Sequence, residues 1–281
     1  MRILILGAKG NLGSQLAAFV NNATAWDLPE VDLTNIIDAR QKIIDLKPDV
    51  IINAAAYNAV DKCETDEAEL RLAYELNRKV VASLAQIALE LKAVFVHYST
   101  DYVFVGDDPG GYREDNQPEP VNKYGQTKYA GELEILKLKD RLKFYLIRTS
   151  RLFGPLGSSP CCKQSFFDLM LELSKRQSEM HAIDEEESCF TYTKDLAKAT
   201  MELIENNKEY GIYHLTNSGP VSWYQAVKYL FDISGISVNL KAISSQEFSR
   251  PAKRPKYSVL LNTKTEPLRS WQEALKDYLK K

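Results

Sequence analysis

Short runs rich in apolar residues alternate along the chain with longer stretches in which apolar residues recur every three or four positions. The short runs predict strands at 2–6, 23–27, 49–56, 93–98, 143–149 and 211–215. The helical spacing follows Gly7 and then covers 64–91, 124–136, 165–175 and 195–206. This alternation predicts an α/β fold, with a doubly wound parallel sheet of the Rossmann type.

The strict alternation is interrupted at 154–160, which is rich in glycine, serine and proline. We therefore expect residues 1–152 to form a Rossmann domain to which 193–215 returns. Residues 153–192 and 216–281 are expected to form a smaller C-terminal α/β substrate-binding domain. Within that part, the acidic run at 184–187 is interpreted as a solvated loop, and Ser222 to Gln225 as a capping box that opens a helix.

Composition narrows the class of protein. Of the 281 residues, 44% are hydrophobic and 26% are charged, and the formal net charge is -2. Nothing in this balance favours a nucleic-acid or anionic-membrane partner, so a small-molecule substrate is expected. No apolar run approaches the length of a membrane span or a signal core, which predicts a cytoplasmic protein. The four cysteines lack zinc-knuckle spacing and are interpreted as reduced, with no metal site predicted.

A glycine-rich turn follows the first predicted strand directly, with Gly7, Gly10 and Gly13 in a G-x-x-G-x-x-G pattern. Such glycines permit a tight turn and close approach of a pyrophosphate, while the helix N-terminus beginning at Asn11 and Leu12 offers free amides. The alternative is an ordinary glycine-rich turn. Its position immediately after the first strand favours dinucleotide binding.

A carboxylate, Asp27, ends the second predicted strand twenty residues after Gly7, where a Rossmann fold places the group that binds the adenosine ribose. No arginine follows to receive a 2′-phosphate, so NADH is favoured and NADPH stays possible. The alternative interpretation of Asp27 is a solvated turn residue. Small residues at the end of the third strand, Ala54, Ala55 and Ala56, would let a cofactor pass close over the backbone.

Tyr124 and Lys128 are separated by four positions and so lie on one helical face. A phenol paired with an ammonium suits carbonyl reduction, in which the phenol protonates the developing alkoxide. Tyr224 and Lys228 share the spacing but lie far from every cofactor element, and we interpret them as structural. Thr100, at the end of the fourth strand, could bond the substrate carbonyl or simply cap the strand. His97 is expected in the core.

Taken together, these residues resemble the extended short-chain dehydrogenase/reductase superfamily, and within it the dTDP-4-dehydrorhamnose reductase family. The resemblance spans nearly the whole chain and rests on the glycine turn and on residues 48–57, 59–62, 99–104, 112–115, 124–128, 148–150, 211–215, 222–224 and 253–255. It implies transfer of hydride from a nicotinamide to the C4 ketone of a nucleotide-linked 6-deoxyhexose, the last step in making dTDP-L-rhamnose.

The resemblance also implies roles for individual residues. Thr100, Tyr124 and Lys128 would be the catalytic triad, and Asp101 would help to bind the sugar. Tyr98, Tyr124 and Lys128 would contact the cofactor, and Asp32 and Leu33 would flank its adenine. Arg254 would face the substrate diphosphate from the basic loop 250–256, which could alternatively be simply exposed.

Two departures lie on the substrate side. The family has tryptophan where this chain has Arg151, and an Asp-Gln-x-Gly-x-Pro-Thr loop where this chain reads Asp184-Glu-Glu-Glu-Ser-Cys-Phe-Thr191. A different 4-keto-6-deoxy sugar nucleotide therefore stays open as substrate. So does a non-catalytic regulatory subunit similar to the beta subunit of methionine adenosyltransferase. An epimerase or dehydratase is disfavoured because Tyr102 follows Asp101. A homodimer is possible, and a magnesium requirement is left open.

Overall fold

The computed structural model describes residues 1–280 and has a six-stranded sheet at its centre. Its strands run in the order β10-β5-β4-β3-β1-β2, and every neighbouring pair is parallel. Their bounds are β1 (Ile3–Leu6), β2 (Thr24–Trp26), β3 (Val50–Asn53), β4 (Val94–Thr100), β5 (Phe144–Thr149) and β10 (Gly211–His214). The predicted doubly wound α/β fold is confirmed, and the strand near 211–215 does join the main sheet.

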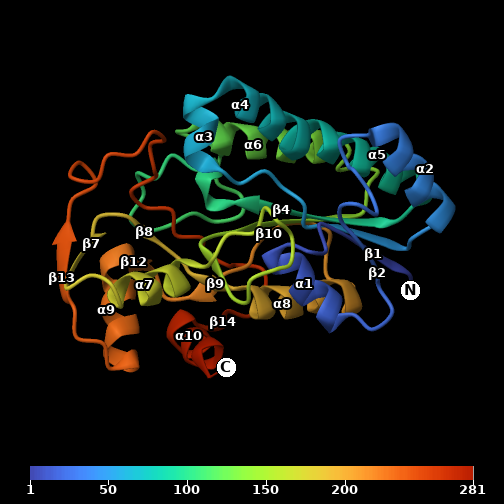
Figure 1. Cartoon of the computed structure of the whole chain (residues 1–281). Coiled ribbons are helices and arrows are strands. Elements are labelled where there is room, and N and C mark those ends of the chain that lie inside the picture. Colours follow the sequence, from blue (N-terminus) through green and yellow to red (C-terminus); the bar gives the residue numbers. More distant parts are fainter. Residues whose placement is uncertain (281) are drawn as a thin grey trace.

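Helices cover both faces of this sheet (Figure 1). One face carries α2 (Ile36–Leu46), α5 (Val80–Leu91) and α6 (Lys123–Leu136), and the other carries α1 (Asn11–Phe19) and α8 (Thr193–Glu205). Each face has its own apolar core: Ile5, Leu16 and Ile147 lie in one, and Leu4, Leu84 and Phe95 in the other. The inner strands β1, β3, β4 and β5 are almost entirely buried, which is why they read as continuous apolar runs, whereas the edge strands β2 and β10 are only partly buried.

The helical stretch expected over 64–91 is not one helix. It divides into α3 (Val60–Thr65), α4 (Glu67–Tyr74), a π-helix at Glu75–Lys79 and then α5. The break falls at Asp66, whose backbone is extended (φ -134°) and whose carboxylate accepts hydrogen bonds from the amides of Ala68 and Glu69. Asp66 therefore ends one helix and caps the next.

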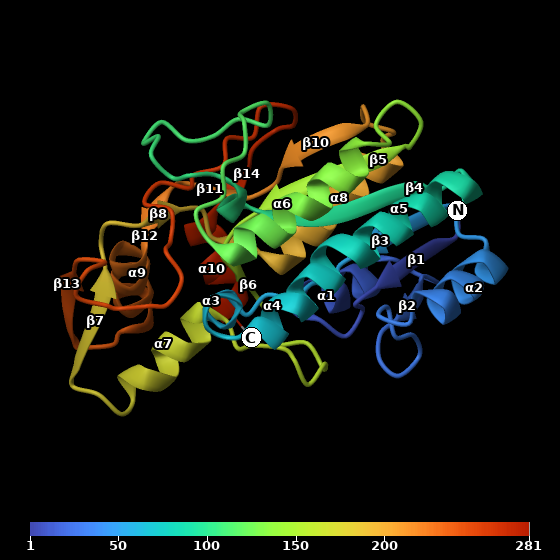
Figure 2. The same ribbon diagram turned by 90° about the horizontal axis from the view of Figure 1, so that it is seen from above.

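The remaining elements surround a third core beyond one end of the main sheet (Figure 2). They include α7 (Phe166–Ser174), α9 (Trp223–Ser234) and α10 (Trp271–Leu279). Four two-stranded sheets complete this region: β6 (Leu152–Phe153) with β9 (Thr191–Tyr192), β7 (Glu179–Ile183) with β13 (Asn239–Ile243), β8 (Glu187–Ser188) with β12 (Val221–Ser222), and β11 (Asn217–Ser218) with β14 (Leu268–Ser270). Aromatic side chains such as Phe153, Phe167, Phe190 and Trp271 dominate the core.

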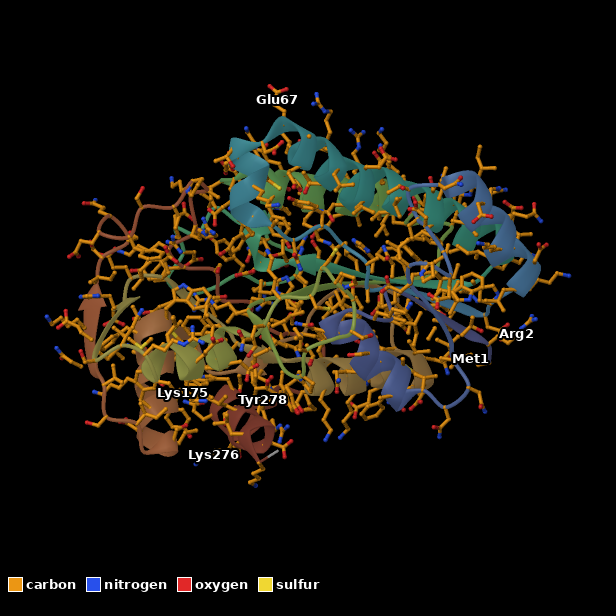
Figure 3. All side chains as sticks on the ribbon, in the orientation of Figure 1. Met1, Arg2, Glu67, Lys175, Lys276 and Tyr278 are labelled. Atoms are coloured by element: carbon orange, nitrogen blue, oxygen red, sulfur yellow. The ribbon has the colours of Figure 1, made fainter. Side chains whose placement is uncertain are left out.

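Two predictions for this region were wrong in part. The acidic run is solvated only in part: Asp184 and Glu185 are exposed as predicted, but Glu186 is 3% exposed. Ser222 does cap α9 through the Gln225 amide at 3.1 Å, but the reciprocal capping box is found at Ser270 and Glu273. Charged side chains that do project into solvent include Glu67 on α4 (Figure 3).

Within residues 1–280, no helix is both long and apolar enough to cross a membrane.

Candidate functional site

The glycine turn lies between the carboxyl ends of β1 and β3, where the strand order of the sheet reverses direction. Gly7 has a φ of +75°, and a Cβ there would lie 2.6 Å from the amide nitrogen of Ala55. A Cβ on Gly13 would lie 2.0 Å from the carbonyl oxygen of Gly7. Both positions therefore require glycine, and the turn is held against both α1 and β3.

The amides at the start of α1 are suited to a dinucleotide pyrophosphate. Ser14 makes the first intrahelical bond, to the Gly10 carbonyl at 2.9 Å, so the amides of Asn11, Leu12 and Gly13 precede the helical ladder. The first turn carries no acidic residue that would repel an anion. The Asn11 side chain accepts from the Gly157 amide and donates to the Lys163 carbonyl, both at 2.9 Å. It thus fixes the segment 157–163 beside the turn.

Asp27 lies next to this turn, as expected. Its carboxylate accepts hydrogen bonds from the amides of Lys9 at 2.9 Å and Leu28 at 2.8 Å. The Lys9 ammonium forms an exposed ion pair with Glu30 at 2.9 Å. A cation and a carboxylate therefore both stand at the place predicted for the adenosine ribose.

The remaining residues predicted to contact the cofactor differ in how exposed they are. Asp32 accepts from the Thr34 amide at 2.9 Å and the Thr34 hydroxyl at 2.7 Å, whereas Leu33 is buried in the core. After β3, Ala54 and Ala55 are partly buried and Ala56 is exposed.

The three residues predicted as catalytic meet at the carboxyl end of β4. Asn122 caps α6 by accepting from the Gly125 amide at 2.8 Å, which places Tyr124 in the first turn of that helix. A Cβ on Gly125 would lie 2.2 Å from the Tyr102 carbonyl oxygen, so α6 packs directly on the 3-10 helix Asp101–Val103. This close packing brings the Tyr124 phenol next to the Thr100 hydroxyl.

Burial controls the ionisation of this cluster. It raises the pKa of Tyr124 above its usual value, and the nearby Asp101 carboxylate raises it further. Burial also lowers the pKa of Lys128 to about 8. Burial and Asp101 account for the raised pKa of Tyr124, and the effect of Lys128 on the phenol stays a prediction. The Lys128 ammonium donates to the Tyr98 carbonyl oxygen at 2.6 Å.

Tyr98 was predicted to contact the cofactor, but its side chain is engaged elsewhere. The ring lies in the core and the hydroxyl donates to Thr200 at 2.8 Å. Only its carbonyl oxygen, through Lys128, is joined to the catalytic cluster. His97 is 1% exposed, and its Nδ1 lies 3.1 Å from the Asn53 amide nitrogen. It is a core residue, as expected.

Asp101 is 2% exposed and is surrounded by hydroxyls. One of its carboxylate oxygens accepts from Ser258 at 2.6 Å and from Ser188 at 2.9 Å. Burial raises the pKa of Asp101, although these serines and the positive charge of Arg151 oppose that shift. Neither serine is part of a recognisable sequence motif, so the sequence does not predict its contact with Asp101.

Arg151 joins the end of β5 to the C-terminal region. Its backbone has a φ of 40°, which is uncommon outside glycine. Its guanidinium donates to the carbonyls of Glu186 at 2.8 Å and Val221 at 2.9 Å, and lies 3.9 Å from the centre of the Trp223 ring. The two departures from the family pattern are therefore in direct contact.

Arg254 was predicted to face a diphosphate, but its guanidinium is already occupied. It donates to both oxygens of Asp61, at 2.5 and 2.7 Å, and to the Ala252 carbonyl at 2.7 Å, and it lies beside the Tyr102 hydroxyl. Its neighbour Arg250 pairs with the buried Glu186. The basic loop 250–256 is thus attached to both α3 and the 184–187 segment rather than free.

No group of three or more histidine, cysteine, aspartate or glutamate side chains that could hold a metal ion occurs within residues 1–280. All four cysteines are free thiols.

Comparison with known proteins decides the family. The family model described as RmlD substrate binding domain matches residues 1–281. The chain belongs to this family. The resemblance to dTDP-4-dehydrorhamnose reductases drawn from the motifs is confirmed.

The relatives found in these comparisons align with nearly the full length of this chain. A dTDP-4-dehydrorhamnose reductase of Aggregatibacter actinomycetemcomitans is 36% identical, covering 98% of this chain and 97% of that protein. The spore coat polysaccharide biosynthesis protein SpsK of Bacillus subtilis (strain 168) is 33% identical over 99% of this chain and 96% of its own. A crystal structure of dTDP-4-dehydrorhamnose reductase from Bacillus anthracis str. Ames, in complex with NADP, has a TM-score of 0.90 at 34% identity, covering 99% and 98% of the two chains.

Proposed function

We propose that this member of the family is an NAD(P)H-dependent oxidoreductase that reduces the C4 ketone of a nucleotide-linked 6-deoxy-4-ketohexose. The proposed reaction converts dTDP-4-dehydro-L-rhamnose to dTDP-L-rhamnose. The observation that carries the proposal is the contact between Thr100 and Tyr124, with buried Lys128 one turn further along α6. This cluster stands at the same sheet edge as the glycine turn, where open α/β sheets bind their ligands.

The proposed roles follow from protonation states. A raised pKa keeps the Tyr124 phenol protonated at neutral pH, so it acts as the acid that protonates the developing alkoxide. Thr100 hydrogen-bonds the same oxygen and so helps to hold the carbonyl against Tyr124. Lys128, whose pKa is about 8, is an ammonium at pH 7 and orients the nicotinamide ribose. The nicotinamide, when bound, supplies the hydride.

The remaining parts of the site fit a nucleotide sugar. Residues 153–192 and 216–280 form the proposed substrate-binding domain around their own aromatic core. Asp101, with Arg151 and Tyr102 beside it, receives the sugar at the junction with the Rossmann domain. Asp27 favours NADH by offering a carboxylate to the adenosine ribose.

The experiment follows NADH absorbance with purified protein and dTDP-4-dehydro-L-rhamnose generated in place by the preceding enzymes. We expect oxidation that requires the sugar nucleotide and that falls by about 100-fold or more in Tyr124→Phe, because the general acid is removed. Dinucleotide binding by that variant, followed by fluorescence, should be retained. Unchanged turnover in Tyr124→Phe would refute the assignment of the acid.

Absence of oxidation despite tight NADH binding would exclude this sugar nucleotide as substrate. Other 4-keto-6-deoxy sugar nucleotides would then be tested in the same assay. A stoichiometric enzyme recovered in a pull-down, together with no turnover on any of them, would instead favour a regulatory subunit.

A further inference from the structure

Glu186 is the meeting point of two arginines that come from different parts of the chain. Its carboxylate is bonded by Arg250, with one N–H···O distance of 3.2 Å, and by the indole nitrogen of Trp223 at 3.0 Å. Its backbone carbonyl is bonded by Arg151. The charge of Arg151 also acts on the Glu186 carboxylate. Arg250 therefore pairs with this buried carboxylate directly, while Arg151 is held at the backbone of the same residue.

The Arg250 side borders a cavity of about 290 Å³, lined by Arg250, Lys253, Arg254, Lys256, Glu185 and Glu186 among others. Arg254, which lines this cavity, lies beside Tyr102, and Tyr102 packs edge-on against Tyr124 with 6.0 Å between the ring centroids. A sugar held at Tyr124 would thus extend its diphosphate toward this cavity. Four cations from one loop suit such a group.

The two arginines of this loop differ in how firmly they are held. Arg254 is bonded by Asp61 through both carboxylate oxygens and also by a carbonyl. In the described part of the chain, the hydrogen bonds of Arg250 go to Glu186 alone. Arg250 can therefore exchange one carboxylate for a phosphate without breaking a wider network.

We propose that Glu186 occupies the place of the substrate diphosphate on Arg250, and that the diphosphate displaces it while Arg151 keeps the released carboxylate neutralised. The inference rests on the proposed function in taking the substrate to be a nucleoside diphosphate derivative. It assigns Glu186 as an internal competitor that sets the affinity for the diphosphate.

The test measures binding of dTDP to the full-length protein by calorimetry, in the wild type and in single variants. Glu186→Gln should bind dTDP about 3- to 10-fold more tightly, because the competing charge is removed while Arg250 is kept. Arg250→Met should bind it at least about 10-fold more weakly. Glu185→Gln is the matched control: the same charge lines the same cavity but bonds Ser245 at the surface, and we expect a change below about 2-fold.

Coupling separates competition from a general charge effect. In the Arg250→Met background, Glu186→Gln should no longer tighten dTDP binding, because there is no longer a cation to release. Unchanged NADH affinity in each variant shows that the fold is intact. Weaker or equal dTDP binding in Glu186→Gln, a gain that persists without Arg250, or no dTDP binding by the wild type would each overturn the proposal. Turnover of the ketosugar is measured separately, so failure of the reductase assay with these affinities intact would refute the reaction and not the exchange.

Discussion

The ammonium of Lys128 donates a hydrogen bond to the backbone carbonyl of Tyr98 at 2.6 Å, and only 2% of this lysine is exposed. The ammonium therefore forms its hydrogen bond with the backbone near the end of β4 and not with a carboxylate. Its pKa is about 8 because burial penalises the charged form more than Glu132, one turn further along α6, can restore. This single value gives two separable predictions.

The first concerns turnover against pH. If the ammonium orients the nicotinamide ribose, kcat/KM should fall as the pH rises through about 8, the pKa of Lys128 in the free protein. Lys128→Arg keeps its charge at high pH, so its residual activity should lose this basic limb. Measurement of kcat/KM from pH 6 to 10 in both proteins checks this. If kcat/KM of the wild type stays constant up to pH 10, the charge of Lys128 is not required for the reaction.

The second concerns stability. The folded-state pKa of Lys128 lies below its ordinary value of 10.5, so the unfolded chain binds the proton more tightly. The cost to folding is therefore complete below about pH 8 and is relieved as the pH rises toward 10.5. It amounts to about 3 kcal/mol. Relative to wild type, Lys128→Met should gain stability at pH 7 and lose part of that advantage by pH 9.5, as measured by urea unfolding at both values.

A third prediction follows from the ion pair between Arg148 on β5 and Glu132 on α6. The side chains are 1% and 0% exposed, and they share three hydrogen bonds of 2.7 to 3.2 Å. Removing one partner leaves a buried charge, so Glu132→Gln should lower the free energy of unfolding by about 3 to 5 kcal/mol. The exposed pair Arg40–Glu90 is the control, and Glu90→Gln should cost less than about 1 kcal/mol. If urea unfolding shows the same loss of unfolding free energy in Glu132→Gln and Glu90→Gln, burial does not determine how much the Arg148–Glu132 pair contributes.

The sequence predicted the parts of this site that lie within single short segments. The glycine turn, Asp27, and the Tyr124–Lys128 spacing each follow from local backbone or helical geometry. The helix break at Asp66 also has a local signal in the sequence. An aspartate followed three positions later by a glutamate, here Glu69, is typical of a helix N-terminus. The serines on Asp101 and the carboxylate of Glu186 had no local signal, because their contacts join residues 35 to 157 positions apart. The direction of the Tyr124 pKa also depended on burial, which spacing does not reveal.

The fourth prediction concerns the choice between NADH and NADPH, which rests on two charges beside the glycine turn. The amide of Lys9 binds Asp27, and its ammonium pairs with Glu30 while 35% exposed. To reach a 2′-phosphate, the Lys9 ammonium exchanges an exposed ion pair and a hydrogen bond to the Leu28 carbonyl at 2.5 Å for the phosphate, whereas Asp27 repels that phosphate and accepts the ribose hydroxyls of NADH. Lys9→Met should therefore weaken NADPH by about 5- to 20-fold and NADH by less than about 2-fold. Asp27→Ala should do the opposite, weakening NADH more than NADPH. Fluorescence titration of both variants with both dinucleotides checks this prediction. Equal effects on NADH and NADPH affinity would refute the assignment of both residues to the ribose site.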